Sequence, residues 1–246
     1  MPYQQDVVFS GEQMIPGKTN SRIEEEHQAR YKFAEQFVKD KVVLDIACGV
    51  GYGTKHLKDA QARHVFGVDI SDQVINYAKT HYSTTGVEFQ CLNATNLNFD
   101  RSCFDVIVSF ETIEHLSDAD RNAYLQELQR VLKPDGILLL STPNRRVTSP
   151  GQTKPRNSHH VREYTLKELE AILLQYGFVV TDTFGQVIRH KLLHFKPIQK
   201  IVSLLKRIHI LFSKQIDKKQ NSAVVSFRRN YEPRYYVVIA QSRNIV

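Results

Sequence analysis

Residues 41–54 read KVVLDIACGVGYGT, and this stretch decides the fold. An apolar run, KVVLDI, leads into a segment in which glycine occupies positions 49, 51 and 53. Continuous apolar runs of this length are typical of strands that are covered on both faces of a sheet. Glycine lets the backbone turn sharply and admits a ligand close to the main chain. We therefore predict a buried strand that ends in a ligand-binding turn.

Further apolar stretches follow, and they alternate with stretches whose apolar residues recur at helical spacing. Helix starts are marked by Ser71-Asp72 and by a capping box of Thr165 with Glu168. Strands alternating with helices predict an α/β fold, a doubly wound and mostly parallel sheet with helices on both faces. The seven predicted strands cover residues 41–46, 64–70, 87–92, 104–110, 136–143, 178–187 and 235–241.

Two carboxylates flank the glycine segment. Asp45 ends the first strand, and Asp69 ends the second strand 20 residues after Gly49. A carboxylate at the second position accepts hydrogen bonds from ribose hydroxyls. A dinucleotide site needs a third glycine where Thr54 stands, and Asp45 would lie unfavourably beside a pyrophosphate. A cationic amino-acid ligand suits Asp45 better, so a nicotinamide-dependent oxidoreductase is disfavoured.

Over residues 41–145 the sequence resembles the class I S-adenosylmethionine-dependent methyltransferases. VLDIACGVGYG is similar to their first motif, and GVDIS is similar to their acidic second-strand motif. FDVIVSFETIEHL and LQRVLKPDGILLLSTPN resemble the fourth-strand and fifth-strand regions. The resemblance implies a Rossmann-like sheet whose last strand is antiparallel, and S-adenosyl-L-methionine as the cofactor. It does not specify the methyl acceptor.

The resemblance also implies which residues contact the cofactor. The glycine backbone packs around the methionyl part, and Asp45 lies near the amino group, directly or through water. Asp69 holds the ribose, and Ile70 lies against the adenine. EEEHQARYKFA resembles a helix that closes over the cofactor, which nominates His27, Arg30 and Tyr31. The cofactor-binding residues expected on this basis are Tyr31, Asp45, Ala47, Gly49, Gly51, Gly53, Asp69, Ile70, Asn93, Ala94, Phe110 and Glu111.

Methyl transfer is an in-line displacement at a sulfonium carbon, so the protein mainly aligns the acceptor with the methyl group. A hydroxyl acceptor also benefits from a general base. The predicted catalytic residues are His115, Glu111 and His160. Three alternatives stay open: His115 orients its loop, Glu111 binds the methionyl end, and His160 lies in a solvated loop. No metal site is predicted, because none of the three cysteines forms a CxxC pair.

The acceptor is expected to be a small molecule. FSGEQMIPG and HVREYT resemble segments of bacterial methyltransferases that act on sugars of surface polysaccharides, which implies O-methylation of a nucleotide- or lipid-linked sugar. The polar loop 144–160 is expected at the acceptor site. N- or C-methylation, methylation of RNA and a non-catalytic binding role are the alternatives. Nucleic acid is disfavoured, because FETI follows the fourth strand instead of an Asn/Asp-Pro-Pro-aromatic segment.

The net charge of +7 is concentrated in one region. Nine basic residues and a single acid, Asp217, lie between positions 186 and 220. We divide the chain into a cap helix region (1–40), a methyltransferase core (41–187), a basic helical insertion (188–233) and a final core strand (234–246). The insertion is expected to pack on its own domain or on a second subunit of a homodimer. The alternative is that residues 188–220 contact an anionic membrane surface. The sequence contains neither a signal peptide nor a long apolar run. We therefore predict a cytoplasmic location, with the inner membrane surface as an alternative.

Overall fold

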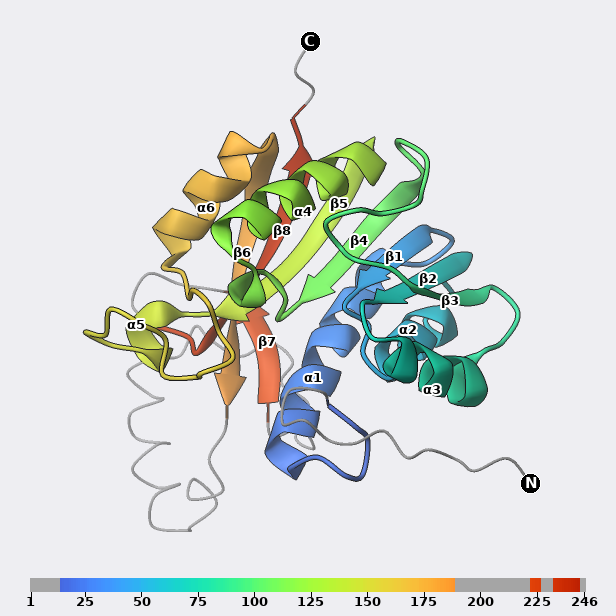
Figure 1. Ribbon diagram of the computed structural model, residues 1–246, viewed down its shortest axis with the longest axis horizontal. Coiled ribbons are helices and arrows are strands. Elements are labelled where there is room, and N and C mark those ends of the chain that lie inside the picture. The colour runs from blue at the N-terminus through green and yellow to red at the C-terminus, as the bar shows by residue number, and fades with distance from the viewer. Residues whose placement is uncertain (1–13, 189–221, 227–231, 244–246) are drawn as a thin grey trace, which may run out of the picture.

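The computed structural model describes residues 14–188, 222–226 and 232–243 (Figure 1). One mixed sheet forms its centre, and helices pack on both of the faces. The elements in chain order are α1 (Ser21–Ala34), η1 (Glu35–Phe37), β1 (Val42–Ile46), α2 (Tyr52–Asp59), β2 (His64–Asp69), α3 (Asp72–Tyr82), β3 (Val87–Cys91), β4 (Phe104–Phe110), η2 (Ile113–His115), α4 (Asp118–Val131), β5 (Leu132–Pro143), α5 (Arg145–Thr148), α6 (Leu166–Gln175), β6 (Phe178–Ile188), β7 (Ser222–Ser226) and β8 (Tyr235–Ser242).

The strand order β3-β2-β1-β4-β5-β8-β6-β7 confirms the doubly wound sheet. Strands β1 to β5 pair with their neighbours in parallel, and β8 runs antiparallel between β5 and β6. The chain winds outward in one direction from β1 and in the other from β4. Ligands of such sheets bind beyond the carboxyl ends of the strands at this reversal point. The fold therefore places the glycine segment after β1 at the expected binding edge.

The sheet contains an eighth strand that the sequence analysis did not predict. Strand β7 pairs antiparallel with the outer edge of β6, with Ser222 opposite Ile188 and Ser226 opposite Phe184. This corrects the prediction of a helical insertion over 188–233 for the part that is described. The sequence SAVVS suits a strand, because β-branched residues favour extended backbone. The apolar stripe of the predicted helix and the surface proposed for a membrane or second subunit lie outside the described residues.

The two faces of the sheet have separate apolar cores. On one face, α4 and α6 pack against alternate residues of β1, β4, β5 and β8. On the other face, α1 and α2 pack against the intervening residues of the same strands. Figure 1 shows α4 and α6 in front of the sheet. Among the described residues, no helix has the length and apolar character needed to cross a membrane.

The two predicted helix starts are confirmed. The Ser71 side chain accepts a hydrogen bond from the Val74 amide at the start of α3, and Thr165 with Glu168 forms the capping box of α6. Residues 133–136, whose sequence KPDG is typical of a turn, are part of β5, which begins directly after α4. The pairing of β4 with β5 shifts between Phe104 and Val106. Residues 133–136 lie at this irregularity in the strand pairing, so the chain passes from helix to strand without a separate turn.

Candidate active site

The glycine segment forms a tight turn at the end of β1. Gly49 and Gly51 have φ angles of 55° and 90°, in the left-handed region that favours glycine. A Cβ on Gly49 would meet nothing within 4 Å, and Gly49 lines a large cavity. A Cβ on Gly53 would lie 2.0 Å from the Tyr31 ring. The turn therefore presents Gly49 to a ligand, whereas the absence of a side chain at Gly53 lets α1 pack close to α2.

Asp69 lies on the wall of the same cavity, at the end of β2. Its carboxylate accepts hydrogen bonds from the amides of Gly49, at 3.1 Å, and Ser71, at 3.0 Å. These bonds fix the carboxylate beside the glycine turn. Burial raises the pKa of Asp69, although the backbone hydrogen bonds oppose this shift. Ile70, 70% exposed, presents an apolar surface next to it.

Asp45 lies behind the cavity wall. Its carboxylate is fully buried and accepts hydrogen bonds from the Tyr31 hydroxyl, at 3.1 Å, and the Thr54 hydroxyl, at 2.7 Å. Burial raises the pKa of Asp45 to about 7, although both hydrogen bonds lower it. Tyr31 lines the cavity, and its ring packs edge-on against Tyr52 and Phe110. In this structure Tyr31 therefore stands between Asp45 and any ligand.

Helix α1 closes one side of the cavity. Arg30 is buried and donates a hydrogen bond of 2.6 Å to Gln186 on β6, while its guanidinium lies 5.3 Å from the centre of the Tyr235 ring. Gln186 in turn donates to the carbonyl of Glu26 at 2.7 Å. His27 also lines the cavity, and burial lowers its pKa, as does nearby Arg30. These contacts attach α1, the predicted cap helix, to β6 and β8.

Acidic residues follow β4 on the opposite wall. Glu111 has a φ angle of 52°, and its carboxylate accepts a hydrogen bond of 2.7 Å from Ser141. Glu114 is fully buried, and one of its carboxylate oxygens accepts from Thr142 at 2.9 Å. Burial raises the pKa of Glu114, and the charge of Glu111 raises it further. The sharp backbone turn at Glu111 directs the chain after β4 along the cavity.

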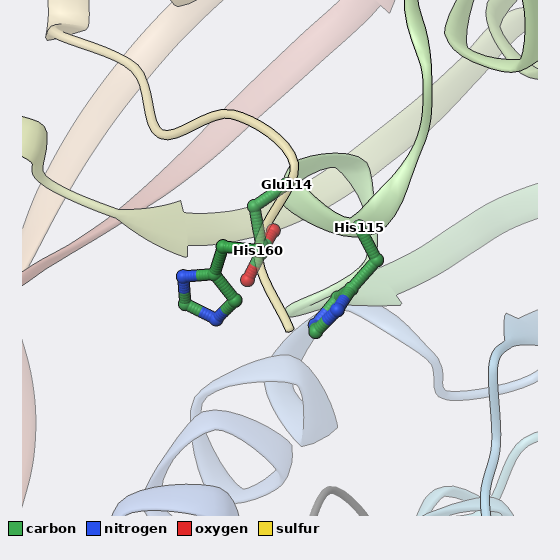
Figure 2. A group of neighbouring side chains, drawn as sticks. All are labelled: Glu114, His115 and His160. Atoms are coloured by element: carbon green, nitrogen blue, oxygen red, sulfur yellow. The ribbon is translucent and has the colours of Figure 1, made fainter. Parts of the chain in front are cut away.

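His160 comes from the loop between α5 and α6. Its Nδ1 lies 2.9 Å from a carboxylate oxygen of Glu163, and its Nε2 lies 2.9 Å from the Asn157 side-chain nitrogen. The rings of His115 and His160 meet edge to face with centroids 4.9 Å apart. Figure 2 shows Glu114, His115 and His160 pointing toward one another. His115 and His160, which are 45 positions apart in the sequence, thus line the same cavity.

The cavity has a volume of about 1020 Å³. Sites for small ligands measure about 300–1,000 Å³, so this one has room for a cofactor and a small acceptor. Most of the predicted site residues line it, whereas Asp45, Gly51 and Gly53 do not. The predicted residues on its wall are Tyr31, Ala47, Gly49, Asp69, Ile70, Asn93, Ala94, Phe110, Glu111, His115 and His160.

Sequence reasoning missed several residues on the wall. Asn157 and Glu163 both contact His160. The signal for these two residues is their place beside His160 in the segment RNSHHVREY. Arg234 and Tyr235 also line the cavity, at the start of the last strand, and no sequence pattern connected them with the site.

A glycine turn after β1, a carboxylate after β2 and a cavity at the reversal point define an α/β protein that binds a ligand with a ribose. Residues 43–136 match the family described as "Methyltransferase domain". A probable S-adenosylmethionine-dependent methyltransferase of Mycolicibacterium smegmatis is 35% identical over 178 residues, 72% of this chain and 67% of that protein. The chain belongs to the S-adenosylmethionine-dependent methyltransferases, and its cofactor is S-adenosylmethionine.

Two further similarities are more distant. A ubiquinone biosynthesis O-methyltransferase of Coxiella burnetii is 37% identical over 123 residues, which span 47% of this chain and 50% of that protein. The fold is similar to that of Burkholderia thailandensis 1,6-didemethyltoxoflavin-N1-methyltransferase with bound S-adenosylhomocysteine, at a TM-score of 0.57 and 17% identity. That match covers 92% of this chain and 80% of the other.

Proposed function

We propose that this enzyme methylates a hydroxyl group of a small, polar acceptor, and that the acceptor is a sugar in a nucleotide- or lipid-linked glycan precursor. The observation that carries the proposal is the set of residues that line the cavity. By the first part of this lining we mean Gly49, Asp69 and Ile70, and by the second part we mean polar side chains from α5 and the loop before α6, together with Arg234 and Tyr235. The first part suits the cofactor, which leaves the second for the acceptor.

The residues of the first part fit S-adenosylmethionine. Open space at Gly49 admits the ligand to the main chain, and the Asp69 carboxylate is held where it can accept hydrogen bonds from a ribose. Ile70 offers an exposed apolar surface for a purine. The cofactor supplies the methyl group on a positively charged sulfur, which is already an activated leaving group. The chain's own task is therefore to align the acceptor and to remove its proton.

The second part of the cavity fits a sugar. Thr148, Arg156, Asn157 and Arg234 provide hydrogen-bonding groups, and Tyr235 provides an aromatic ring. A sugar presents several hydroxyls to such groups and an apolar face to a ring. The arginines would also suit the phosphates of a nucleotide- or lipid-linked precursor. The relative from C. burnetii is by name an O-methyltransferase, which supports a hydroxyl as the acceptor group.

Glu111, His115 and His160 are proposed to act on the acceptor hydroxyl. All three line the same cavity as Gly49, Asp69 and Ile70. A base in this position takes the hydroxyl proton as the oxygen attacks the methyl carbon. The Glu163 carboxylate at 2.9 Å keeps the His160 ring oriented.

The test is a methylation assay with isotopically labelled S-adenosylmethionine and separate panels of nucleotide sugars, polyprenyl-linked sugars, quinol precursors and RNA. We expect label transfer to a sugar, located on oxygen by mass spectrometry of the product. Transfer to RNA or to a quinol precursor, with none to any sugar, would replace the proposed acceptor while leaving the enzyme class intact. Label on a nitrogen would overturn O-methylation.

A further inference from the structure

Three potential metal ligands converge on the acceptor side of the cavity. Glu114 and His115 come from the η2 turn after β4, and His160 comes from the loop before α6. Each residue offers one ligand atom, and these atoms all lie within 4.8 Å of one another. All three side chains line the cavity. A single ion between them could contact all three residues with small side-chain rotations.

Glu114 provides the second, independent observation. The residue is fully buried, and its Oε2 is satisfied by Thr142. Its Oε1 is also buried but has no hydrogen-bond partner among the described residues. A buried carboxylate oxygen without a partner is costly, because it loses its hydration without compensation. A cation at this place would remove that cost, and so would a donor group of a ligand.

The surroundings of the two histidines prepare them as ligands. His160 Nδ1 lies 2.9 Å from Glu163, whose second oxygen accepts a hydrogen bond from Thr148. If Nδ1 donates its proton to Glu163, the lone pair of His160 lies on Nε2. In the same way, donation from His115 Nδ1 to the carbonyl of His159, at 3.1 Å, places the lone pair of His115 on Nε2. Carboxylate and carbonyl partners of this kind orient metal-bound histidines in many proteins.

We propose that Glu114, His115 and His160 bind one divalent transition-metal ion. Two imidazole nitrogens with one carboxylate oxygen suit Zn²⁺, Mn²⁺ or Fe²⁺, whereas Mg²⁺ and Ca²⁺ prefer sites made of oxygen ligands. Three protein ligands leave coordination positions for other groups, and the cavity provides access to them. The Asn157 side chain, now 2.9 Å from His160 Nε2, would give up that contact to the ion.

The role of the ion rests on the proposed O-methylation. An acceptor hydroxyl bound to a divalent ion has a lowered pKa and is held in a fixed position. In the transfer, the acceptor oxygen forms a bond to the methyl carbon, and the carbon–sulfur bond breaks with its electron pair remaining on sulfur. The hydroxyl proton passes to Glu111, which lies on the same wall. The reaction consumes no oxidant or reductant.

Metal binding can be tested without the cofactor or an acceptor. The full chain is stripped with a chelator, dialysed and titrated with Zn²⁺ by calorimetry and with Co²⁺ by visible absorption. We expect one ion per chain, and at least tenfold weaker binding in Glu114→Gln and in His160→Ala. The matched control is His81→Ala. His81 is exposed on α3, stacks on Tyr77 and lies far from the three ligands in the sequence. Thermal unfolding of each variant shows whether it is folded.

The outcomes separate this proposal from the proposed function. Absence of a stoichiometric ion in the wild-type protein, or an unchanged affinity in folded Glu114→Gln and His160→Ala, overturns the metal site whatever the acceptor is. A bound ion that depends on these residues supports the site even where no sugar is methylated. Asn157→Ala is expected to bind the ion at least as tightly as the wild type, and a tenfold loss there would place the ion elsewhere.

Discussion

The hydroxyl of Tyr31 donates a hydrogen bond to the Asp45 carboxylate, at 3.1 Å, and joins the cap helix to the end of the first strand. Because this hydrogen is committed to Asp45, the Tyr31 oxygen keeps its lone pairs for another donor. We therefore expect a cationic amino group of the cofactor to reach Asp45 through Tyr31 and not directly.

Replacing Asp69 with alanine should weaken the binding of S-adenosylmethionine by more than tenfold, a loss of roughly 1.4 kcal/mol or more. The carboxylate is fixed beside the glycine turn by two amides and is the group expected to hold the ribose. Calorimetric titration measures the dissociation constant. Asp59→Ala is the control, because Asp59 lies on α2 and contacts Lys55. An unchanged affinity in Asp69→Ala would refute the ribose assignment.

The raised pKa of Asp45 should appear as a pH dependence of stability. Its ordinary pKa is 3.8, and burial raises it to about 7 in the folded protein. Between these values the folded state binds more protons than the unfolded state, so the free energy of unfolding falls as the pH rises from about 4 to about 7. This loss amounts to at most about 1.4 kcal/mol per pH unit.

Asp45→Asn removes that titration. As the pH rises through this range, the wild type should therefore lose stability relative to Asp45→Asn. Above pH 7 the difference in unfolding free energy between the two proteins should level off. Urea unfolding at a series of pH values provides the measurement. A constant difference from pH 4 to pH 8 would show that Asp45 is ionised throughout. Other titrating groups occur in both proteins and cancel in the comparison.

Gly53→Ala should disturb the closure of the cap helix. A Cβ at Gly53 would lie 2.0 Å from the Tyr31 ring, so the ring and α1 must shift. Overpacking of this kind costs about 1–3 kcal/mol in unfolding free energy. The double variant Gly53→Ala/Tyr31→Ala removes the ring that the new methyl group meets. Its destabilisation should be smaller than the sum of the two single effects, and additivity would show that the two sites do not clash.

Gln186→Leu should destabilise the fold by roughly 2–3 kcal/mol, because it leaves a buried guanidinium group without its partner. Arg30 donates to Gln186 across the cavity edge, and Gln186 also donates to the backbone of α1. Denaturant unfolding measures the loss. Gln175→Leu, on the exposed end of α6, is the matched control and should remain within about 0.5 kcal/mol of the wild type. Equal stability of the two variants would show that Arg30 needs no side-chain partner.

His115→Ala and His160→Ala should lower turnover by at least tenfold while leaving the affinity for S-adenosylmethionine within threefold. Both rings line the cavity and are proposed to contact the acceptor, whereas Gly49 and Asp69 are proposed to hold the cofactor. His159→Ala serves as the control from the same loop, because the substitution keeps the backbone carbonyl of residue 159 that contacts His115 in the hydrogen bond described above. Initial rates and calorimetry on the same preparations provide the two values. Full turnover in both histidine variants would remove them from the mechanism.

Most of the fold could be predicted because its signals are local. Each of the seven strands was marked by an apolar run, and the helices by periodic apolar residues and caps such as Ser71 and Thr165. Strand β7 escaped prediction, because SAVVS is a short segment that is held by tertiary contacts, its pairing with β6 and its packing against α1. The place of Gly49 and Asp69 on the cavity wall could be predicted for the same reason as the strands, since both residues lie at or just after the ends of their strands in the sequence.

The sequence by itself determined the sheet, the glycine turn and the class of cofactor, because these depend on residue patterns that span a few positions at a time. Only the tertiary structure decided that Tyr31 covers Asp45, that Arg30 reaches Gln186, and that His160 joins Glu114 and His115. Each of these contacts joins two separate segments of the chain, and no periodic pattern in the sequence links those segments. Their geometry follows from how the cap helix and the loop before α6 pack on the finished sheet.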